Sequence, residues 1–278
     1  MKKNCPVISV VMVFYNAEQY IEEAVKSVLK QSFQDFEFLL IDDGSKDQSA
    51  RIVEKFKDDR IRTIHKGHDY IASLNYGLDC AQGKYIARMD ADDIMHPDRL
   101  FVQYRLMEDK PWIDFCSSWC TFFEEKTGKK VLYNESSGVI KDPLVSLLHK
   151  NIFTHPTMIF KTEFLKKNNL KYHHYNYAED YKMWVEAAKL GANFYIEPQS
   201  LLFYRCHEQQ VSTTKSEEQR KTSFQIKEEI MDCLLPDLPK ELKDFYDCLC
   251  NMEIKNMVKQ DLKIAFISEI LKQNKIMR

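Results

Sequence analysis

The stretch Tyr85-Ile-Ala-Arg-Met-Asp-Ala-Asp-Asp93 is a short apolar run that ends in three carboxylates. The apolar run predicts a buried strand. Carboxylates crowded at a strand end repel one another, and a bound cation with its anionic ligand is the usual way in which proteins tolerate them. Asp90 and Asp92 form an Asp-x-Asp pattern, whose oxygen ligands suit Mg²⁺ or Mn²⁺. Alternatively the cluster caps a helix, and we expect Asp93 to cap the helix that follows while its neighbours bind the cation.

Strand and helix patterns alternate through the residues that precede this stretch. Runs of apolar, β-branched residues predict buried parallel strands, and apolar residues at helical spacing predict the connecting helices. In chain order these segments are strand 7–14, helix 21–29, strand 36–41, helix 47–56, strand 61–64 and helix 71–81. The pattern predicts an open parallel sheet, in which ligands lie beyond the C-terminal ends of the strands.

Polar residues follow the first two predicted strands. Tyr15 and Asn16 follow the first strand, and the turn Asp42-Asp43-Gly44-Ser45 follows the second. At the ligand edge of the sheet, the two carboxylates can accept hydrogen bonds from a nucleobase N–H or from ribose hydroxyls. The same four residues are also common in a simple turn that leads into a helix. The turn by itself favours neither interpretation.

Composition excludes several classes of protein. The 278 residues, 44% of them hydrophobic, suffice for one large α/β domain with an appendage. A net charge of -2, without a long basic run, argues against nucleic-acid binding. The eight cysteines lack paired zinc spacing, and no apolar stretch approaches the roughly twenty residues of a membrane span. We therefore expect a cytoplasmic protein, with the inner face of the cell membrane as an alternative location.

Taken together, the motifs resemble those of the family-2 glycosyltransferases. The set comprises Val-Val-Met-Val-Phe-Tyr-Asn at 10–16, Asp-Asp-Gly-Ser at 42–45, Ser-Leu-Asn-Tyr-Gly-Leu at 73–78, Ala-Arg-Met-Asp-Ala-Asp-Asp at 87–93, His-Pro-Thr at 155–157, Glu-Asp-Tyr at 179–181 with Trp184, and Tyr-Arg at 204–205 with His207. It spans roughly residues 5–213. The resemblance implies a GT-A fold, a nucleotide-diphosphate-sugar donor, and inversion at the anomeric carbon.

The resemblance also implies roles for individual residues. Asp42 and Asp43 look like the uridine-contacting acids, Asp90 and Asp92 like the metal-diphosphate pair, and Asp180 like the catalytic base. One carboxylate suffices as a base that takes the proton from the attacking hydroxyl. Alternatively, Glu179 and Asp180 only stabilise the positive N-terminus of a predicted helix.

The remaining candidates fall into donor, acceptor and metal groups. On the donor side they are Tyr15, Asn16, Asn75, Arg88 and Arg205. On the acceptor side they are His155, Glu179 and Trp184, and for the metal they are Asp92 and His207. A charged Arg88 inside a strand needs a carboxylate or the donor as its partner. His207 can ligate a metal through a neutral imidazole, or it is an ordinary surface histidine. Residues 65–70 lack the Asn-x-Gly often found before the family's next motif, which leaves sugar contacts near Asn75 open.

The predicted organisation is a GT-A domain over residues 1–213 and a helical extension over residues 214–278. The donor-binding half is expected at about 1–110 and the acceptor-binding half at 111–213, with loops of weak periodicity at 110–150 and 165–178. In the extension, helices are predicted at 216–235, 237–251 and 253–273. Their apolar faces indicate packing on the domain, with a homodimer seam or peripheral membrane contact as alternatives.

The sequence therefore predicts an inverting, metal-dependent, hexosyltransferase-type enzyme. It would use Mn²⁺ or Mg²⁺ to move a sugar from a nucleotide-diphosphate sugar, a UDP-sugar by resemblance, to a glycan or lipid-linked acceptor. Bacterial surface polysaccharide or lipopolysaccharide synthesis is the expected setting. The alternatives are a sugar-nucleotidyltransferase, which the missing Gly-rich loop after the first strand disfavours, and a non-catalytic sugar-nucleotide-binding subunit. Donor sugar, acceptor and linkage do not follow from the sequence.

Overall fold

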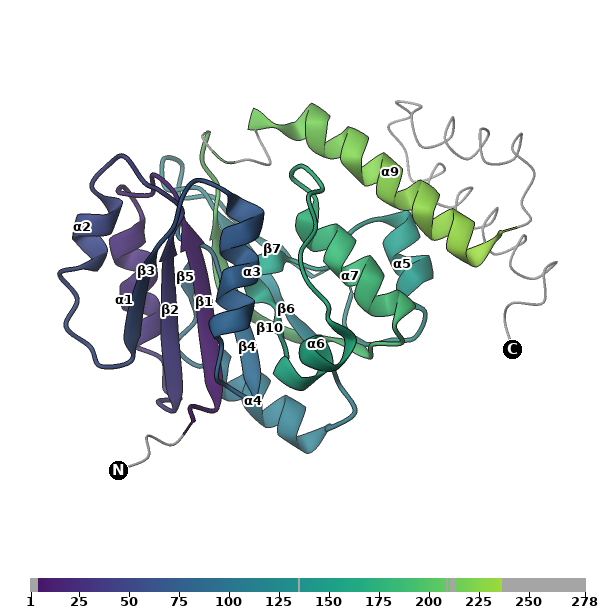
Figure 1. Ribbon diagram of the computed structural model, residues 1–278, viewed down its shortest axis with the longest axis horizontal. Coiled ribbons are helices and arrows are strands. Elements are labelled where there is room, and N and C mark those ends of the chain that lie inside the picture. The colour runs from purple at the N-terminus through teal and green to yellow at the C-terminus, as the bar shows by residue number, and fades with distance from the viewer. Residues whose placement is uncertain (1–4, 135, 209, 211–213, 237–278) are drawn as a thin grey trace.

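The structure is a computed structural model, and it describes residues 5–134, 136–208, 210 and 214–236. These residues form a ten-stranded sheet with helices on both faces (Figure 1). The strands follow one another across the sheet in the order β3-β2-β1-β4-β9-β6-β10-β5, with β7 on β6 and β8 on β10. The predicted α/β fold is therefore confirmed.

The strands range in length from the two residues of β5 to the twelve of β10. Their bounds are β1 Ile8–Phe14, β2 Phe36–Asp42, β3 Ile61–His65, β4 Tyr85–Met89, β5 Ile94–Met95, β6 Phe115–Phe123, β7 Lys130–Tyr133, β8 Gly138–Ile140, β9 Ile159–Lys161 and β10 Phe194–Arg205. The helices are α1 Ile21–Leu29, α2 Ser49–Val53, α3 Tyr70–Cys80, α4 Arg99–Asp109, α5 Pro143–His149, α6 Thr162–Asn168, α7 Glu179–Lys189 and α9 Ser216–Leu234, with a 3₁₀ turn η1 at His155–Thr157.

The first four strands in the sheet order are parallel, as predicted, and their C-terminal ends meet at one edge. In this half, β1 pairs with β2 and β4, and Phe14 lies opposite Asp42 while Met12 lies opposite Met89. The residues that follow each strand, including Asp43 and Asp90, therefore emerge side by side. This register brings the polar motifs of the sequence together. Beyond β4 the sheet is mixed, because β9 runs antiparallel to both β4 and β6.

Strand β1 separates two apolar layers, since its successive side chains point to opposite faces. Val11 and Val13 belong to the layer on one face, which also contains buried side chains of α3, α5, α7 and α9. Val10 and Met12 pack with α1, α2 and α4 on the other face. Burial on both faces explains why the strand reads as a continuous apolar run and not as an alternating one. Figure 1 shows α3 in front of the sheet at this point.

Helix α3 approaches the sheet most closely at Gly77. A Cβ atom at this position would lie 2.6 Å from a methyl of Val11 and 2.8 Å from one of Ile41. Any larger residue would push α3 off strands β1 and β2. Because α3 begins with Asp69 and Tyr70 at the edge of the site, this close packing fixes the position of that edge.

The segment 110–150, which was expected to be loops, contains β6, β7, β8 and α5 instead. Strand β6 lies in the middle of the sheet, but its sequence includes the polar pair Ser117 and Ser118, which hides the apolar pattern. Both serines are buried, and each meets Thr157: the Ser117 hydroxyl lies 2.7 Å from the Thr157 hydroxyl, and the Ser118 N–H donates to it at 3.3 Å. Partners in a distant part of the chain therefore make these polar residues compatible with a central strand.

Helix α9 packs on the domain, as predicted for residues 216–235. The helix lies beside α5 and α7 (Figure 1), and its side chains Ile226, Ile230 and Met231 are buried in the core. Glu229 adds polar contacts, because it accepts a 2.5 Å hydrogen bond from the Tyr175 hydroxyl and pairs with Lys182. The helices predicted at 237–251 and 253–273 lie outside the described residues. In the part of the chain that is described, none of the helices combines the length and the apolar character that a membrane span needs.

Candidate active site

The acidic edge begins with an ion pair between Arg88 and Asp90. Arg88 is fully buried in β4, and its guanidinium donates to Asp90 Oδ1 at 2.8 Å and to the Val11 carbonyl at 2.7 Å. The predicted need of Arg88 for a carboxylate partner is thus met within the same strand end. The pKa of Asp90 is raised to about 6, first by burial, against the lowering effect of Arg88, and then by the carboxylates of Asp92 and Asp180. Asp180 therefore lies close enough to this edge to act on its charge.

His155 lies behind Arg88. Its Nε2 accepts a 3.0 Å hydrogen bond from Arg88 Nε and lies 2.8 Å from the Tyr172 hydroxyl. Burial, and then the charge of Arg88, lower the pKa of His155 well below its ordinary value, so the imidazole is neutral. This hydrogen bond holds the Arg88 guanidinium at a second point, in addition to Asp90.

Asp92 and His207 meet across the loop between β4 and β5. Asp92 Oδ2 lies 3.0 Å from His207 Nε2, although the two residues are far apart in the sequence. Two adjacent ligands of an octahedral ion with bonds of about 2.1 Å lie roughly 3.0 Å apart, so this pair fits Mg²⁺ or Mn²⁺. The described residues contain no cluster of three or more potential protein ligands for a metal. A diphosphate and water would have to complete the coordination.

Arg205 braces this loop from β10. It is 1% exposed, and its backbone N–H donates to Asp93 Oδ1 at 2.9 Å while its Nε donates to the Asp92 carbonyl at 2.7 Å. The rest of its guanidinium pairs with Glu23 and Glu125. The side chain thus points into the protein and its donors are engaged there.

The expectation that Asp93 caps the next helix is wrong. Helix α4 begins only at Arg99, with Asp98 at its N-cap position, and the short strand β5 intervenes. Asp93 is buried, 1% exposed, and its carboxylate accepts the Arg205 backbone N–H across the sheet. The sequence pattern misplaced the helix start because Ile94–Met95 pair with β10 instead of beginning the helix.

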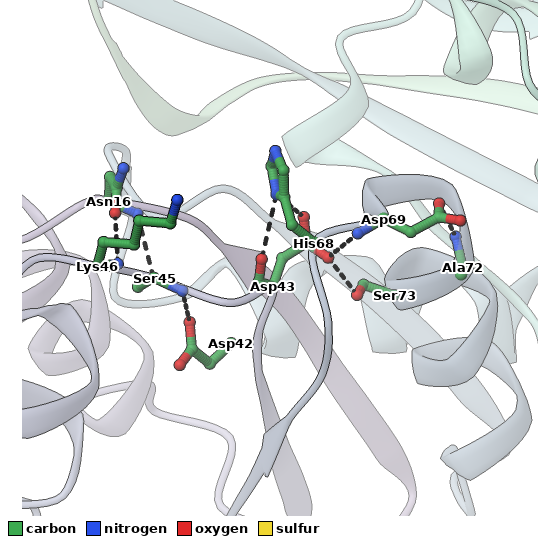
Figure 2. Close-up of polar contacts among 9 residues, drawn as sticks. All are labelled: Asn16, Asp42, Asp43, Ser45, Lys46, His68, Asp69, Ala72 and Ser73. Carbon is green, nitrogen blue, oxygen red and sulfur yellow. Dashed lines mark hydrogen bonds and ion pairs between the residues drawn. The ribbon is translucent and has the colours of Figure 1, made fainter.

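The two acids of the 42–45 turn are buried and hold the loops around them (Figure 2). Asp42 accepts the Ser45 N–H at 2.9 Å. Asp43 Oδ1 accepts the Ser73 hydroxyl at 2.6 Å and the Asp69 N–H at 3.0 Å. These bonds tie the end of β2 to the start of α3.

Tyr15 and Asn16 follow β1 and complete this edge of the sheet. Asn16 adopts a left-handed backbone conformation with a φ of 50°, and its side-chain oxygen accepts the Lys46 N–H at 2.8 Å (Figure 2). The Tyr15 ring stacks on the His68 ring with centroids 4.1 Å apart, and His68 Nδ1 lies 2.9 Å from Asp43 Oδ2. Both rings are exposed at the rim, where a flat nucleobase would meet them.

Asn75 takes no part in this edge. Its amide bonds both ways with the backbone of Tyr172, donating to the carbonyl at 2.9 Å and accepting the N–H at 2.8 Å. The residue thereby connects α3 to the loop that precedes α7. The structure does not bring it together with the acidic cluster through any direct contact.

Asp180 lies in the first turn of α7 and is half-buried. Its Oδ1 accepts the Tyr181 N–H at 2.6 Å, and its Oδ2 accepts the Asn151 amide at 3.0 Å. Burial raises the pKa of Asp180, although these two bonds and the indole of the buried Trp184 lower it in part. A carboxylate that is fixed in place and has a raised pKa is suited to accept a proton. Burial, and then the Asp180 charge, raise the pKa of the adjacent Glu179 to about 8.

A cavity of about 330 Å³ opens beside Asp180, between α7 and α9. Asn151, Ala178 and Tyr181 line one side with Asp180. Ser216, Gln219, Arg220 and Ser223 of α9 line the other side. The candidate base therefore faces a space into which a small hydroxyl compound fits.

Sequence reasoning missed Asn151, His68 and the α9 wall of the cavity. Asn151 belongs to no recognisable motif. Its role arises only because the fold brings its amide next to Asp180 in α7. His68 lies in the segment where the expected Asn-x-Gly is missing, and that departure was the available signal. The α9 segment was expected to pack on the domain through its apolar face, but an amphipathic pattern does not show what the polar residues of the helix cover.

A parallel half-sheet with an acidic edge is the architecture of α/β proteins that bind nucleotides beyond their strand ends. Comparison with known proteins agrees. The model of glycosyl transferase family 2 matches residues 9–175, and this chain belongs to that family. An uncharacterized glycosyltransferase of Haemophilus influenzae is 35% identical over 87% of this chain and 78% of its own. One from Methanocaldococcus jannaschii is 33% identical over 72% of this chain and 71% of its own.

Two solved structures share the fold. S. aureus TarS in complex with UDP-GlcNAc aligns with a TM-score of 0.68 at 20% identity, over 95% of this chain and 80% of that one. The mannosyltransferase PcManGT from Pyrobaculum calidifontis, in complex with GDP-Man and Mn²⁺, aligns with a TM-score of 0.60 at 17% identity, over 98% and 76% of the two chains. The family and the GT-A fold, both expected from the motifs, are confirmed.

Proposed function

We propose that this glycosyltransferase inverts the anomeric carbon as it moves one sugar from a nucleotide-diphosphate sugar to a hydroxyl of a glycan or lipid-linked acceptor. The observation that carries the proposal is the position of Asp180. Its carboxylate is fixed by two hydrogen bonds, borders the cavity, and interacts electrostatically with the Asp-x-Asp edge. Inversion in a single displacement needs such a base on the side of the sugar opposite to the leaving group.

The donor would lie along the edge from Tyr15 to Asp92. In this proposal the nucleobase of the donor lies at the rim formed by Tyr15 and His68. Asn16, Asp42 and Asp43 hold the surrounding loops. A UDP-sugar is the proposed donor, by the motif resemblance and because TarS of the same fold has been solved with UDP-GlcNAc.

Asp92 and His207 would hold Mn²⁺ or Mg²⁺. A divalent cation at this position supplies positive charge to the diphosphate as the sugar bond breaks. Support comes from the 3.0 Å separation of the two side chains and from PcManGT, solved with Mn²⁺. Asp90, neutralised in part by Arg88, would lie next to the diphosphate, while Arg88 and Arg205 would act by positioning Asp90 and Asp92 and not by touching the donor.

Asp180 would take the proton from the acceptor hydroxyl during attack. Asn151 keeps the carboxylate in place, and the raised pKa of Asp180 makes it a better proton acceptor than an exposed aspartate. Glu179, with a pKa of about 8, would be neutral next to Asp180 at pH 7 and would leave the negative charge on Asp180, and Trp184 would support the base from the core. His155 would act indirectly, by accepting a hydrogen bond from Arg88 and so holding its guanidinium in place.

The wider setting remains the one that the sequence suggests: surface polysaccharide or lipopolysaccharide synthesis in a bacterium, in the cytoplasm or at the inner face of the membrane. Homodimer formation or membrane contact through residues beyond α9 also remains a proposal, as does the division of the chain at residues 213 and 214.

Release of nucleoside diphosphate tests the function directly. Wild-type protein would be incubated with UDP-glucose, UDP-GlcNAc, UDP-galactose and GDP-mannose, with Mn²⁺ and with a chelator. Slow, chelator-sensitive release from at least one donor supports the proposal. Binding of a donor without any release would indicate a non-catalytic subunit. Formation of nucleoside triphosphate from donor and added pyrophosphate would indicate a nucleotidyltransferase.

A further inference from the structure

One face of α9 changes character along the helix, from exposed or half-buried polar residues in its first two turns to buried apolar residues further on. Ser216, Gln219, Arg220 and Ser223 recur at the spacing of one helical face, and all four line the cavity next to Asp180. The same face continues through Ile226 and Ile230, which are buried in the core. A helix that only packs on a domain would be apolar along the whole of this face. Its first two turns are instead polar where they meet the cavity.

Among the described residues that line the cavity, Arg220 is the only one with a cationic side chain. Nearby Glu217 pairs with Lys221 at 2.9 Å and not with Arg220. Of the residues that the structure describes, none forms a hydrogen bond or an ion pair within 4 Å with the Arg220 guanidinium. A guanidinium offers a planar set of donors that matches phosphate and carboxylate groups.

Helix α9 also contacts the segment that precedes Asp180, the candidate base. Gln219 donates a 2.8 Å hydrogen bond to the carbonyl of Tyr177. Tyr177 has a φ of 60°, a conformation that non-glycine residues rarely adopt, and it precedes Asp180 by three residues. The polar turns of α9 are therefore part of the structure around the base, and not a remote surface.

We infer that the first two turns of α9 form an acceptor subsite, in which Arg220 binds an anionic group of the acceptor, a phosphate or a carboxylate, next to the hydroxyl that Asp180 deprotonates. This inference rests on the proposed function, since it names the acceptor class for the same site. The guanidinium offsets the repulsion between the Asp180 carboxylate and an anionic acceptor. The hydroxyls of Ser216 and Ser223 are available to neighbouring sugar hydroxyls.

The test uses glycerol 3-phosphate, with glycerol as its neutral counterpart, and the full chain. Binding is measured by ligand-observed NMR without metal or donor, because the carboxylates at the donor edge then repel an anion. We expect wild-type protein to bind glycerol 3-phosphate in preference to glycerol. Arg220→Gln should weaken this binding about tenfold or more, the loss of a charge-assisted hydrogen bond. Asp180→Asn should strengthen it, because a repelling charge is removed.

Lys221→Gln is the matched control, since it removes the same charge from the adjacent position of the same helix. It should leave phosphate binding within about twofold of wild type, and thermal midpoints verify that all variants fold. The inference is overturned if wild type does not prefer the phosphate compound, if Arg220→Gln binds it unchanged, or if Lys221→Gln weakens binding equally. Donor hydrolysis by wild-type protein is measured separately. Its absence would refute the proposed function, whatever the NMR result.

Discussion

Replacement of Asp180 by Asn tests the proposed base without changing the size of the side chain. The carboxylate accepts hydrogen bonds from the Tyr181 N–H and the Asn151 amide. The new amide keeps one oxygen for one of these donors, and its NH₂ group faces the other. Loss of one hydrogen bond costs about 1 kcal/mol, which is too little to unfold a domain of this size.

The expected effect on catalysis is much larger. A positioned general base contributes about 10²- to 10⁴-fold to the rate. At 1.36 kcal/mol per tenfold, its loss raises the barrier by about 2.7 to 5.4 kcal/mol. We therefore expect Asp180→Asn to release nucleoside diphosphate at least about 100-fold more slowly than wild type. Donor affinity should change little, because Asp180 lies on the acceptor side.

The assay combines kcat for donor hydrolysis with calorimetric donor binding in Mn²⁺. The pH profile adds a second readout. A base must be ionised, and the pKa of Asp180 is raised above 3.8, so wild-type activity should fall as pH falls through this raised pKa. The slow variant should lose this limb of the profile. Hydrolysis by Asp180→Asn within a few-fold of wild type, with the same profile, would show that another group is the base.

Three further changes test other parts of the site. Asp92→Ala should abolish the Mn²⁺-dependent part of nucleotide binding without unfolding the protein, and unchanged calorimetric affinity in Mn²⁺ would place the metal elsewhere. Ser73→Ala removes the 2.6 Å donor to buried Asp43 and should lower unfolding free energy by about 1–3 kcal/mol, measured in urea; an unchanged midpoint would show that this bond is unimportant. Glu179 has its pKa raised from 4.5 to about 8, so its contribution to stability is present below pH 4.5 and lost as pH rises through 8. The stability of Glu179→Gln relative to wild type should therefore be greater at pH 9 than at pH 5, by about 1 kcal/mol after discounting for partial exposure. The same difference in unfolding free energy at both pH values would contradict this.

The donor half of the fold follows from the sequence because its signals are local. A continuous apolar run such as Val10 to Phe14 specifies a strand buried on both faces, and the polar residues after it then fall at the ligand edge. The acceptor half depends on contacts between distant segments. Strand β6 reads as a loop until Thr157 is known to satisfy its serines.

The candidate site divides in the same way. The Asp-x-Asp pair stands out because carboxylates crowded at a strand end suggest cation binding, and Asp180 stands out because the motif resemblance points to it. Asn151 does not, since its role arises only from the 3.0 Å contact with Asp180. Arg88 and Arg205 read as ligand-binding cations, because a sequence shows their charge but not that both are fully engaged inside the protein.

The anomeric configuration of the first sugar released from the donor tests the central claim most directly. Proton NMR would follow the hydrolysis of an α-linked nucleotide-diphosphate sugar in Mn²⁺, at enzyme concentrations that release sugar faster than it mutarotates. Attack by one water that is activated by Asp180, on the side opposite to the diphosphate, predicts that the β anomer forms first. Initial release of the α anomer would contradict single displacement and the role of Asp180 as its base.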